Sequence, residues 1–307
     1  MNTQPKTSLH SARRTWLIKS ASYASLSVAL SLALVKAWAW QATDSVSLLS
    51  SLADSVLDLL ASALTFWAVR FSLAPADREH RFGHGKSEGL AALVQSLIIT
   101  GSGVYVCSEA IQRLLAPQPI MAPGIGLAVM LGATLASIVL VSYQNYVSRQ
   151  TGSVAITADA MHYRADVLVN LGVVAAILIA NYTGWLLADP VVGLLVAGYI
   201  IWGALGILGQ ALDILLDREI PDADRKAIMA IAMSHPEVKG LHDMKTRFGG
   251  SHYIVQMHLE LNSQITLWRS HEILDDVEDA IAAQYPDCEM IIHPDPIGFP
   301  ERRERYE

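Results

Sequence analysis

Six long apolar runs fill the first two thirds of the chain and constrain its fold more than any other feature. Each is close to the roughly 20 residues that a helix needs to cross a bilayer. The chain is 52% hydrophobic and 17% charged, whereas soluble chains are about a quarter charged. This composition predicts a membrane protein and excludes a disordered or nucleic-acid-binding chain. The runs span residues 16–40, 46–72, 89–115, 122–147, 154–182 and 190–212.

Basic residues collect in alternate connections between these runs. Because positively charged loops remain on the cytoplasmic side, this pattern predicts that both termini are cytoplasmic, in agreement with six spans. The basic residues are Lys6, Arg13, Arg14 and Lys19 before the first run, Arg70, Arg78, Arg81 and Lys86 between the second and third, and Arg149 between the fourth and fifth.

The remainder of the chain is a different kind of segment. Up to residue 212 there are 12 Lys or Arg and 10 Asp or Glu, but from Asp213 onward there are 10 and 19. One helix pattern begins near Pro221 and a second covers 266–284. Strand patterns cover 238–246, 252–261 and 289–292. This order predicts a small α+β domain, αββαβ, with one sheet face free for a partner. The expected divisions are an N-terminal tail (1–13), a six-helix membrane domain (14–215), a cytoplasmic domain (216–299) and a C-terminal tail (300–307).

Ionisable residues inside the apolar runs are the most informative positions. The second run contains Asp54 and Asp58, and the fifth contains His162 and Asp166; each pair is spaced i, i+4 and therefore shares a helix face. A carboxylate near the middle of a bilayer costs at least about 2.5 kcal/mol, so it indicates a function by default. The alternative is that these groups only hydrogen-bond neighbouring helices, which two such pairs make a weak explanation.

If the two faces oppose each other, three carboxylates and one imidazole meet. Four nitrogen and oxygen ligands without thiolates suit tetrahedral Zn²⁺. The two cysteines, Cys107 and Cys288, are too far apart in sequence to form a CxxC metal site. Without a cation, adjacent carboxylates repel each other, so the empty site is expected to hold protons that a divalent ion must displace. This exchange is the chemical basis of an antiporter.

Two further groups of candidate ligands lie outside the runs. Asp77, His80 and His84 in the loop after the second run have spacings that suit a metal, although a solvated loop with glycine turns is an equal alternative. The cytoplasmic domain contains six of the ten histidines. Strand pairing is expected to gather His242, His258, His293 and Asp295, while His271 lies near the start of the second helix; a carboxylate such as Asp295 could bridge two Zn²⁺ ions.

Four motifs together resemble the cation diffusion facilitators, and within them the bacterial zinc and ferrous-iron efflux pumps of the YiiP/FieF type. The resemblance runs from about residue 14 to residue 296. The motifs are Leu52-Ala-Asp-Ser-Val-Leu-Asp58, Ala76-Asp-Arg-Glu-His-Arg-Phe-Gly-His-Gly-Lys86, Ala158-Asp-Ala-Met-His-Tyr-Arg-Ala-Asp166 and Ile291-Ile-His-Pro-Asp295.

The resemblance implies a homodimeric, proton-coupled metal exporter in the bacterial inner membrane, with six membrane helices and a ferredoxin-like cytoplasmic domain. Its implied transport site is Asp54, Asp58, His162 and Asp166, and its implied loop site is Asp77, His80 and His84. Its implied binuclear cytoplasmic site is His242, His258, His271, His293 and Asp295. It also implies that Lys86 pairs with Asp217 to lock the dimer.

The predicted function is proton-coupled export of Zn²⁺, with Cd²⁺ and Fe²⁺ as alternatives, by alternating access in which the second and fifth helices tilt against the others. Zn²⁺ is expected both as substrate and as a structural or regulatory ion. The alternative is a membrane-anchored metal sensor without transport, which explains the histidines of the tail but not the intramembrane carboxylates. A metalloprotease is disfavoured because the chain lacks HExxH, and a primary pump because it lacks GxxxxGK[ST].

Overall fold

The computed structural model describes residues 9–43, 46–115, 124–183, 185, 187–250 and 252–298. The expected C-terminal tail, 300–307, and most of the expected N-terminal tail lie outside these residues. The chain divides into two compact units, Met1–Leu212 and Asp213–Glu307.

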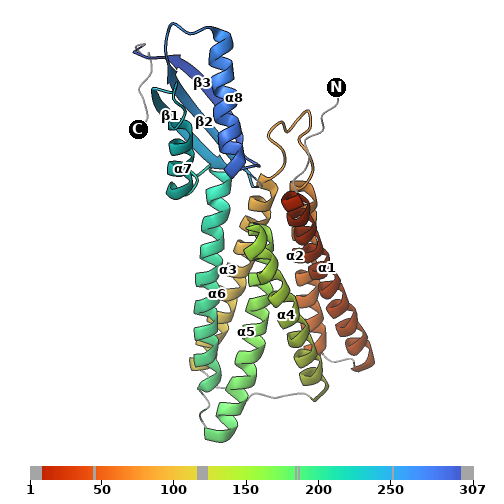
Figure 1. The fold of residues 1–307 in the computed structure, drawn as a ribbon. Coiled ribbons are helices and arrows are strands. Elements are labelled where there is room, and N and C mark those ends of the chain that lie inside the picture. Colours follow the sequence, from red (N-terminus) through yellow and green to blue (C-terminus); the bar gives the residue numbers. More distant parts are fainter. Residues whose placement is uncertain are drawn as a thin grey trace. The chain divides into compact units, whose positions relative to one another are not determined.

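The first unit is built from long helices (Figure 1). Five of them, α1, α2, α3, α4 and α6, are long and apolar enough to cross a membrane, judged by length and composition over the described residues. Helix α5 is of similar length and carries Asp159, His162, Arg164 and Asp166. The helices are α1 (Leu9–Thr43), α2 (Val46–Ser72), α3 (Lys86–Leu115), α4 (Gly124–Thr151), α5 (Val154–Thr183) and α6 (Ala188–Leu215).

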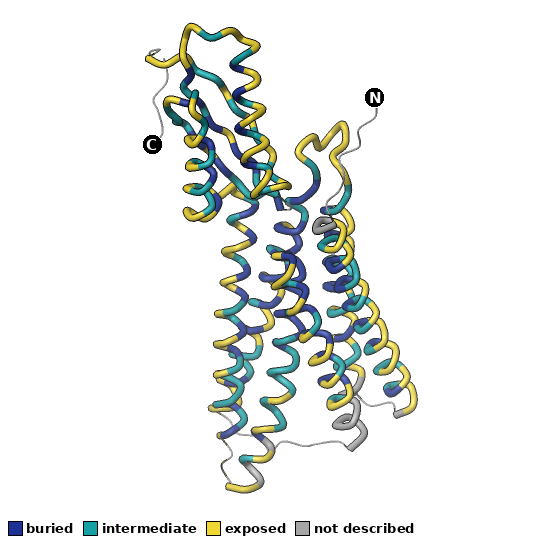
Figure 2. Tube along the Cα trace, in the orientation of Figure 1, coloured by how far each residue is buried: buried dark blue, intermediate teal, exposed yellow. Residues whose placement is uncertain are grey.

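Small side chains allow these helices to pack closely, while large apolar ones face outward. Helix α1 packs mainly on α2 and α4, and α5 packs mainly on α4 and α3. Many of the buried positions in this unit are Ala or Ser, as expected where membrane helices approach each other. Figure 2 shows exposed positions along the outer sides of the helices. Large apolar side chains more than 60% exposed include Leu34, Trp38, Leu57, Leu195 and Trp202, as a lipid-facing surface requires.

Buried polar side chains link four of the helices. Tyr163 Oη on α5 lies 2.8 Å from Ser62 Oγ on α2, which in turn accepts a hydrogen bond of 3.0 Å from Ser25 Oγ on α1. Gln144 Nε2 on α4 donates to Asp159 Oδ2 on α5 at 2.5 Å. All five residues are at most 1% exposed. Because an unpaired buried polar group is costly, these bonds fix how α1, α2, α4 and α5 face one another.

The second unit confirms the αββαβ order. Its three strands form one sheet in the order β1-β2-β3; β1 pairs antiparallel with β2, and β2 pairs parallel with β3. Thr266 caps α8, because its Oγ1 accepts a hydrogen bond from the backbone N–H of Arg269. The elements are α7 (Asp222–Met233), β1 (Gly240–Phe248), β2 (Tyr253–Leu261), α8 (Leu267–Gln284) and β3 (Glu289–Pro296).

From Val255 to Glu260, burial alternates along β2. Val255, Met257 and Leu259 are buried in the core with residues of α7 and α8. Gln256 is exposed and His258 is partly exposed, so the polar positions face away from the core. One face of the sheet therefore packs against the helices, and the other carries polar side chains.

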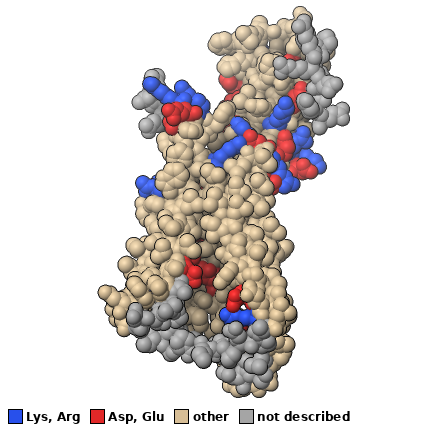
Figure 3. All heavy atoms as spheres, turned by 180° about the vertical axis from the view of Figure 1, so that it is seen from behind, with Lys and Arg blue, Asp and Glu red and all other residues tan. Residues whose placement is uncertain are grey.

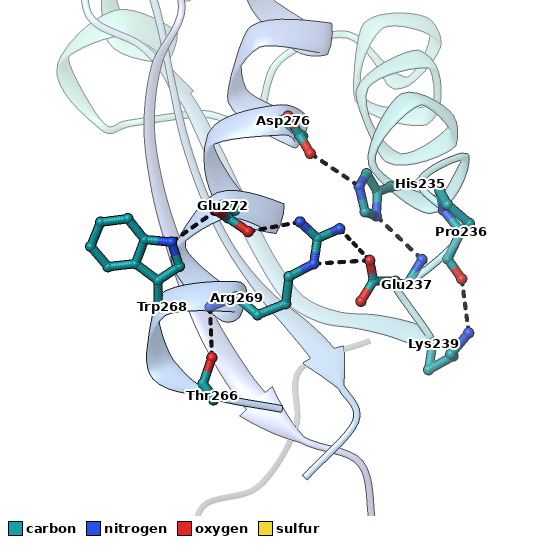
Figure 4. A network of polar contacts seen from close by, with 9 residues as sticks. All are labelled: His235, Pro236, Glu237, Lys239, Thr266, Trp268, Arg269, Glu272 and Asp276. Atoms are coloured by element: carbon teal, nitrogen blue, oxygen red, sulfur yellow. Dashed lines mark hydrogen bonds and ion pairs between the residues drawn. The ribbon is translucent and has the colours of Figure 1, made fainter. Parts of the chain in front are cut away.

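A polar network holds the connection between α7 and β1 against α8 (Figure 4). Arg269 bonds Glu237 through two nitrogens and Glu272 through a third at 2.8 Å. His235 Nε2 lies 3.6 Å from Asp276 Oδ2. Hydrogen bonds from Arg269 lower the pKa of both Glu237 and Glu272. His235 thus takes part in a polar network that joins the α7–β1 connection to α8.

Candidate metal centres

Three of the four predicted transport residues converge between α2 and α5. Asp58, His162 and Asp166 each present a ligand atom within 4.8 Å of the others. His162 Nε2 lies 3.0 Å from Asp58 Oδ1. The i, i+4 spacing places His162 and Asp166 one above the other on α5, and contact between α2 and α5 brings Asp58 to them. Two carboxylates and one imidazole provide three hard or borderline ligands for a divalent cation.

The fourth predicted transport residue, Asp54, is not part of this group. It lies one turn before Asp58 on α2 and is exposed.

The ring of Tyr163 packs edge-on against that of His162, with centroids 5.7 Å apart. Seen from behind, the helical unit is mostly free of charged side chains, with acidic side chains visible in a hollow of its surface (Figure 3).

Two buried carboxylates of the helical unit were given no role from the sequence. Asp159 is 0% exposed and Glu88 3% exposed. Glu88 accepts hydrogen bonds from Ser153 Oγ at 2.6 Å and Ser72 Oγ at 3.4 Å, which joins the start of α3 to α2 and α5. For Asp159 the available signal was its i, i+3 spacing to His162, which puts both on one side of α5. The sequence offers no comparable signal for Glu88.

The predicted loop residues also come together. His80 Nδ1 lies 3.4 Å from Asp77 Oδ1, and His84 Nε2 lies 3.3 Å from Asp77 Oδ2. Asp77 Oδ1 accepts backbone N–H bonds from His80 and Glu79, and the bond from His80 is the main reason that the pKa of Asp77 is lowered. His84 is buried against Phe71, with ring centroids 4.3 Å apart. The loop is therefore folded so that three ligand atoms lie within 4.8 Å of one another.

The largest histidine cluster lies on the polar face of the sheet in the second unit. The register aligns His242 on β1 with His258 on β2 and His293 on β3. Asp295 stands beside this row: its Oδ2 lies 2.7 Å from His258 Nδ1 and 3.4 Å from His242 Nε2, and its Oδ1 lies 3.3 Å from His293 Nε2. One carboxylate thus faces imidazoles with both of its oxygens, the arrangement that a bridging ligand needs.

Two predicted members lie apart from these groups. His271 is exposed on α8, with its Nε2 3.7 Å from Asp275 Oδ2. It is not in the group of His242, His258 and Asp295, whose ligand atoms lie within 4.8 Å of one another. Asp217 forms an ion pair with Arg247 of its own unit, with Nη1 and Oδ2 3.1 Å apart. Lys86 begins α3 in the other unit. Its pairing with Asp217 remains a prediction.

Long apolar helices, partly buried carboxylates that meet a buried imidazole, and an appended histidine-rich domain are typical of a multi-pass membrane transporter for cations. The comparisons agree. The cation efflux transmembrane domain matches residues 22–216, and the cytoplasmic domain of cation efflux proteins matches residues 220–297.

Curated relatives extend this likeness over nearly the whole chain. The cation-efflux pump FieF of Salmonella choleraesuis (strain SC-B67) is 42% identical over 289 residues, which is 94% of this chain and 96% of the relative. FieF of Salmonella arizonae is 42% identical over 286 residues, covering 93% and 95%. The chain belongs to the cation efflux family, the cation diffusion facilitators, and within it to the FieF type.

Solved structures align with a smaller part of the chain. A structure of CzrB in its Zn form has a TM-score of 0.26 and 26% identity, and covers 28% of this chain and 99% of that chain. The metal-bound C-terminal domain of the CzcD transporter from Thermotoga maritima has a TM-score of 0.25 and 22% identity, covering 26% and 93%.

Proposed function

We propose that this protein exports divalent metal ions from the bacterial cytoplasm in exchange for protons, as a homodimer in the inner membrane with both termini cytoplasmic. Zn²⁺ is the proposed substrate, with Cd²⁺ and Fe²⁺ as alternatives. FieF relatives are named cation-efflux pumps and match almost end to end. The family and the arrangement of ionisable groups support the proposal.

One observation carries it: Asp58, His162 and Asp166 meet between α2 and α5. Carboxylates in such surroundings are tolerated only when a cation or protons neutralise them. A dication held by these ligands compensates their charge, and protons on the same ligands do so when it leaves. Because the metal ion and the protons compete for the same ligands, their fluxes are coupled and run in opposite directions. Asp54, one turn away, completes the proposed ligand set if α2 rotates or shifts.

The direction of transport follows from alternating access to this site. Facing the cytoplasm, the site releases protons and binds metal; facing outward, it meets protons that displace the ion. Tilting α2 and α5 as a pair against the other helices would break two buried bonds: Ser25–Ser62 between α1 and α2, and Gln144–Asp159 between α4 and α5. We therefore propose that α1, α2, α4 and α5 move together, in place of the two-helix tilt expected from the sequence.

The other two clusters are proposed to hold resident metal ions. Their donors are imidazole nitrogens and carboxylate oxygens, which suit Zn²⁺. Among the described contacts, Asp295 faces three imidazoles and forms no ion pair with Lys or Arg. His242, His258, His293 and Asp295 would hold metal on the sheet, and His271 remains a proposed further ligand. Asp77, His80 and His84 would hold metal in the loop. Bound there, the ions would supply positive charge that fixes local structure and tunes transport.

The decisive experiment compares wild-type protein with Asp58→Ala in lipid vesicles that enclose a pH-sensitive dye. Wild type is expected to move protons when Zn²⁺ is added, and Asp58→Ala is expected to lose that flux. Asp287→Asn, which changes an exposed carboxylate of the second unit, is the control and should behave as wild type. Flux that survives Asp58→Ala would exclude the proposed site, and absence of flux in wild type would favour a sensor.

A further inference from the structure

Strand β1 contains an irregularity beside the histidine row. His242 pairs with His258, but the next pair is Lys245 with Gln256, so β1 uses one more residue than β2 over this stretch. Within it, Asp243 has a φ of +48°. A left-handed backbone at a residue other than glycine is uncommon and often marks a functional constraint. Bulges of this kind re-aim side chains next to sites.

The bulge changes where the Asp243 carboxylate points. In a regular strand, neighbouring residues project to opposite faces of the sheet. Here Asp243 Oδ2 lies 3.5 Å from Nδ1 of the preceding residue, His242. Both side chains are largely enclosed, at 11% exposed for His242 and 15% for Asp243. The carboxylate and the imidazole therefore face each other in a protected place.

The two ring nitrogens of His242 consequently have different surroundings. Nδ1 faces Asp243, whereas Nε2 faces the cluster, 3.4 Å from Asp295 Oδ2 and 3.9 Å from Glu260 Oε1. A neutral imidazole carries one proton, and its place decides which nitrogen is free to bind metal. With the proton on Nε2, the ring would donate toward Asp295 and offer the ion nothing. Once an ion engages Asp295, the carboxylate at Nδ1 favours the opposite tautomer.

We propose that Asp243 is a positioning residue of the cytoplasmic metal cluster: it accepts the Nδ1 proton of His242 and so presents Nε2 to the ion. Outer carboxylates of this kind orient metal-binding histidines and raise their basicity. The inference rests on the proposed metal site of the second unit and extends it by one residue. It does not depend on the transport site in the helical unit.

The competing explanation is that aspartate stands at residue 243 only because it tolerates a positive φ. Asn tolerates that conformation equally, and Gly adopts it most readily. The two explanations therefore differ in what Asp243→Asn and Asp243→Gly do. If only the backbone matters, both variants keep the site intact. If the carboxylate matters, Asp243→Gly, which removes the acceptor, damages the site most, and Asp243→Asn, which keeps an uncharged oxygen acceptor, damages it less.

The test uses the full chain in detergent with Asp58→Asn and Asp77→Asn, so that the cytoplasmic cluster dominates metal binding. Co²⁺ absorption bands report the ligands, and competition with Zn²⁺ gives the affinity. We expect Asp243→Asn and Asp243→Gly to weaken Zn²⁺ binding about 10- to 100-fold and to alter the Co²⁺ bands. Asp287→Asn, with the same change of charge at an exposed position, should leave both unchanged.

Several outcomes would overturn the inference. If both variants bind within about twofold of the parent while His242→Ala loses binding, Asp243 serves the backbone only. If His242→Ala has no effect, the cluster holds no metal, and the inference fails together with that part of the proposed function. Proton flux in vesicles tests transport separately. Metal-free melting curves check folding, and Asp243→Gly remains informative if the Asn variant is unstable.

Discussion

Replacing Tyr163 by Phe tests whether the buried hydroxyl chain holds the helices together. The change removes one oxygen and keeps the ring, which packs on His162. The lost contacts are the 2.8 Å bond between Tyr163 Oη and Ser62 Oγ and a longer one, 3.5 Å, from Tyr163 Oη to the backbone carbonyl of Ser25, at a residue that is 1% exposed. A buried hydrogen bond contributes about 0.5–1.5 kcal/mol net, and leaving its partner unsatisfied costs about 1–3 kcal/mol.

The structure narrows the expected loss of unfolding free energy. Ser62 keeps its 3.0 Å bond from Ser25 Oγ, so it is not left without a partner. We therefore expect Tyr163→Phe to destabilise the helical unit by about 1–1.5 kcal/mol. For a unit of this size, about 1 kcal/mol corresponds to a shift of about 2–4 °C in melting temperature.

The assay is thermal unfolding in detergent, followed by circular dichroism, for Tyr163→Phe, Ser62→Ala and the double variant. Because the two residues share a bond, Tyr163→Phe should cost about 1 kcal/mol less in the Ser62→Ala background than in wild type. Tyr105→Phe, at a tyrosine 69% exposed, is the control. A melting temperature of Tyr163→Phe equal to that of wild type, or the same loss in both backgrounds, would refute the reasoning.

Three further predictions concern the second unit. Arg269→Gln should flatten the pH dependence of the stability of this unit. Because Arg269 lowers the pKa of Glu237, the stabilisation is present above the ordinary glutamate pKa of about 4.3 and is lost as the pH falls through the lowered value. Melting curves of the variant and wild type between about pH 6 and 3 would reveal the difference. Leu259→Ala, at a residue 0% exposed, should cost about 2–5 kcal/mol in unfolding free energy, and a loss below about 1 kcal/mol would contradict its place in the core. A chelator should lower the melting temperature of metal-loaded wild type but not of His242→Ala, and equal shifts in both would argue against metal on the sheet.

Element types in the second unit could be predicted from the sequence because its patterns are local. The period-two alternation of β2 and the Thr266 cap each reflect a few neighbouring residues. The last strand is longer than expected, reaching Pro296 rather than residue 292. It extends through Pro294 and Pro296 because β3 is an edge strand, where a missing N–H is tolerated.

The candidate sites depend on contacts that a pattern does not specify. Spacing placed His162 with Asp166 on one face, but which aspartate of α2 reaches them depends on how the helices are rotated; Asp58 does and Asp54 does not. The histidine row required the exact strand register. The bulge at Asp243 adds one residue to β1, and no turn or glycine signal marks it.

The central claim is that Asp58, His162 and Asp166 bind the transported ion together. Anomalous diffraction at the zinc absorption edge, from crystals of the full chain soaked in Zn²⁺, tests it most directly. The account predicts a peak about 2 Å from His162 Nε2 and from a carboxylate oxygen of each aspartate, which disappears in Asp58→Ala. A fully zinc-loaded crystal with peaks in the loop and on the sheet, but none between α2 and α5, would contradict it.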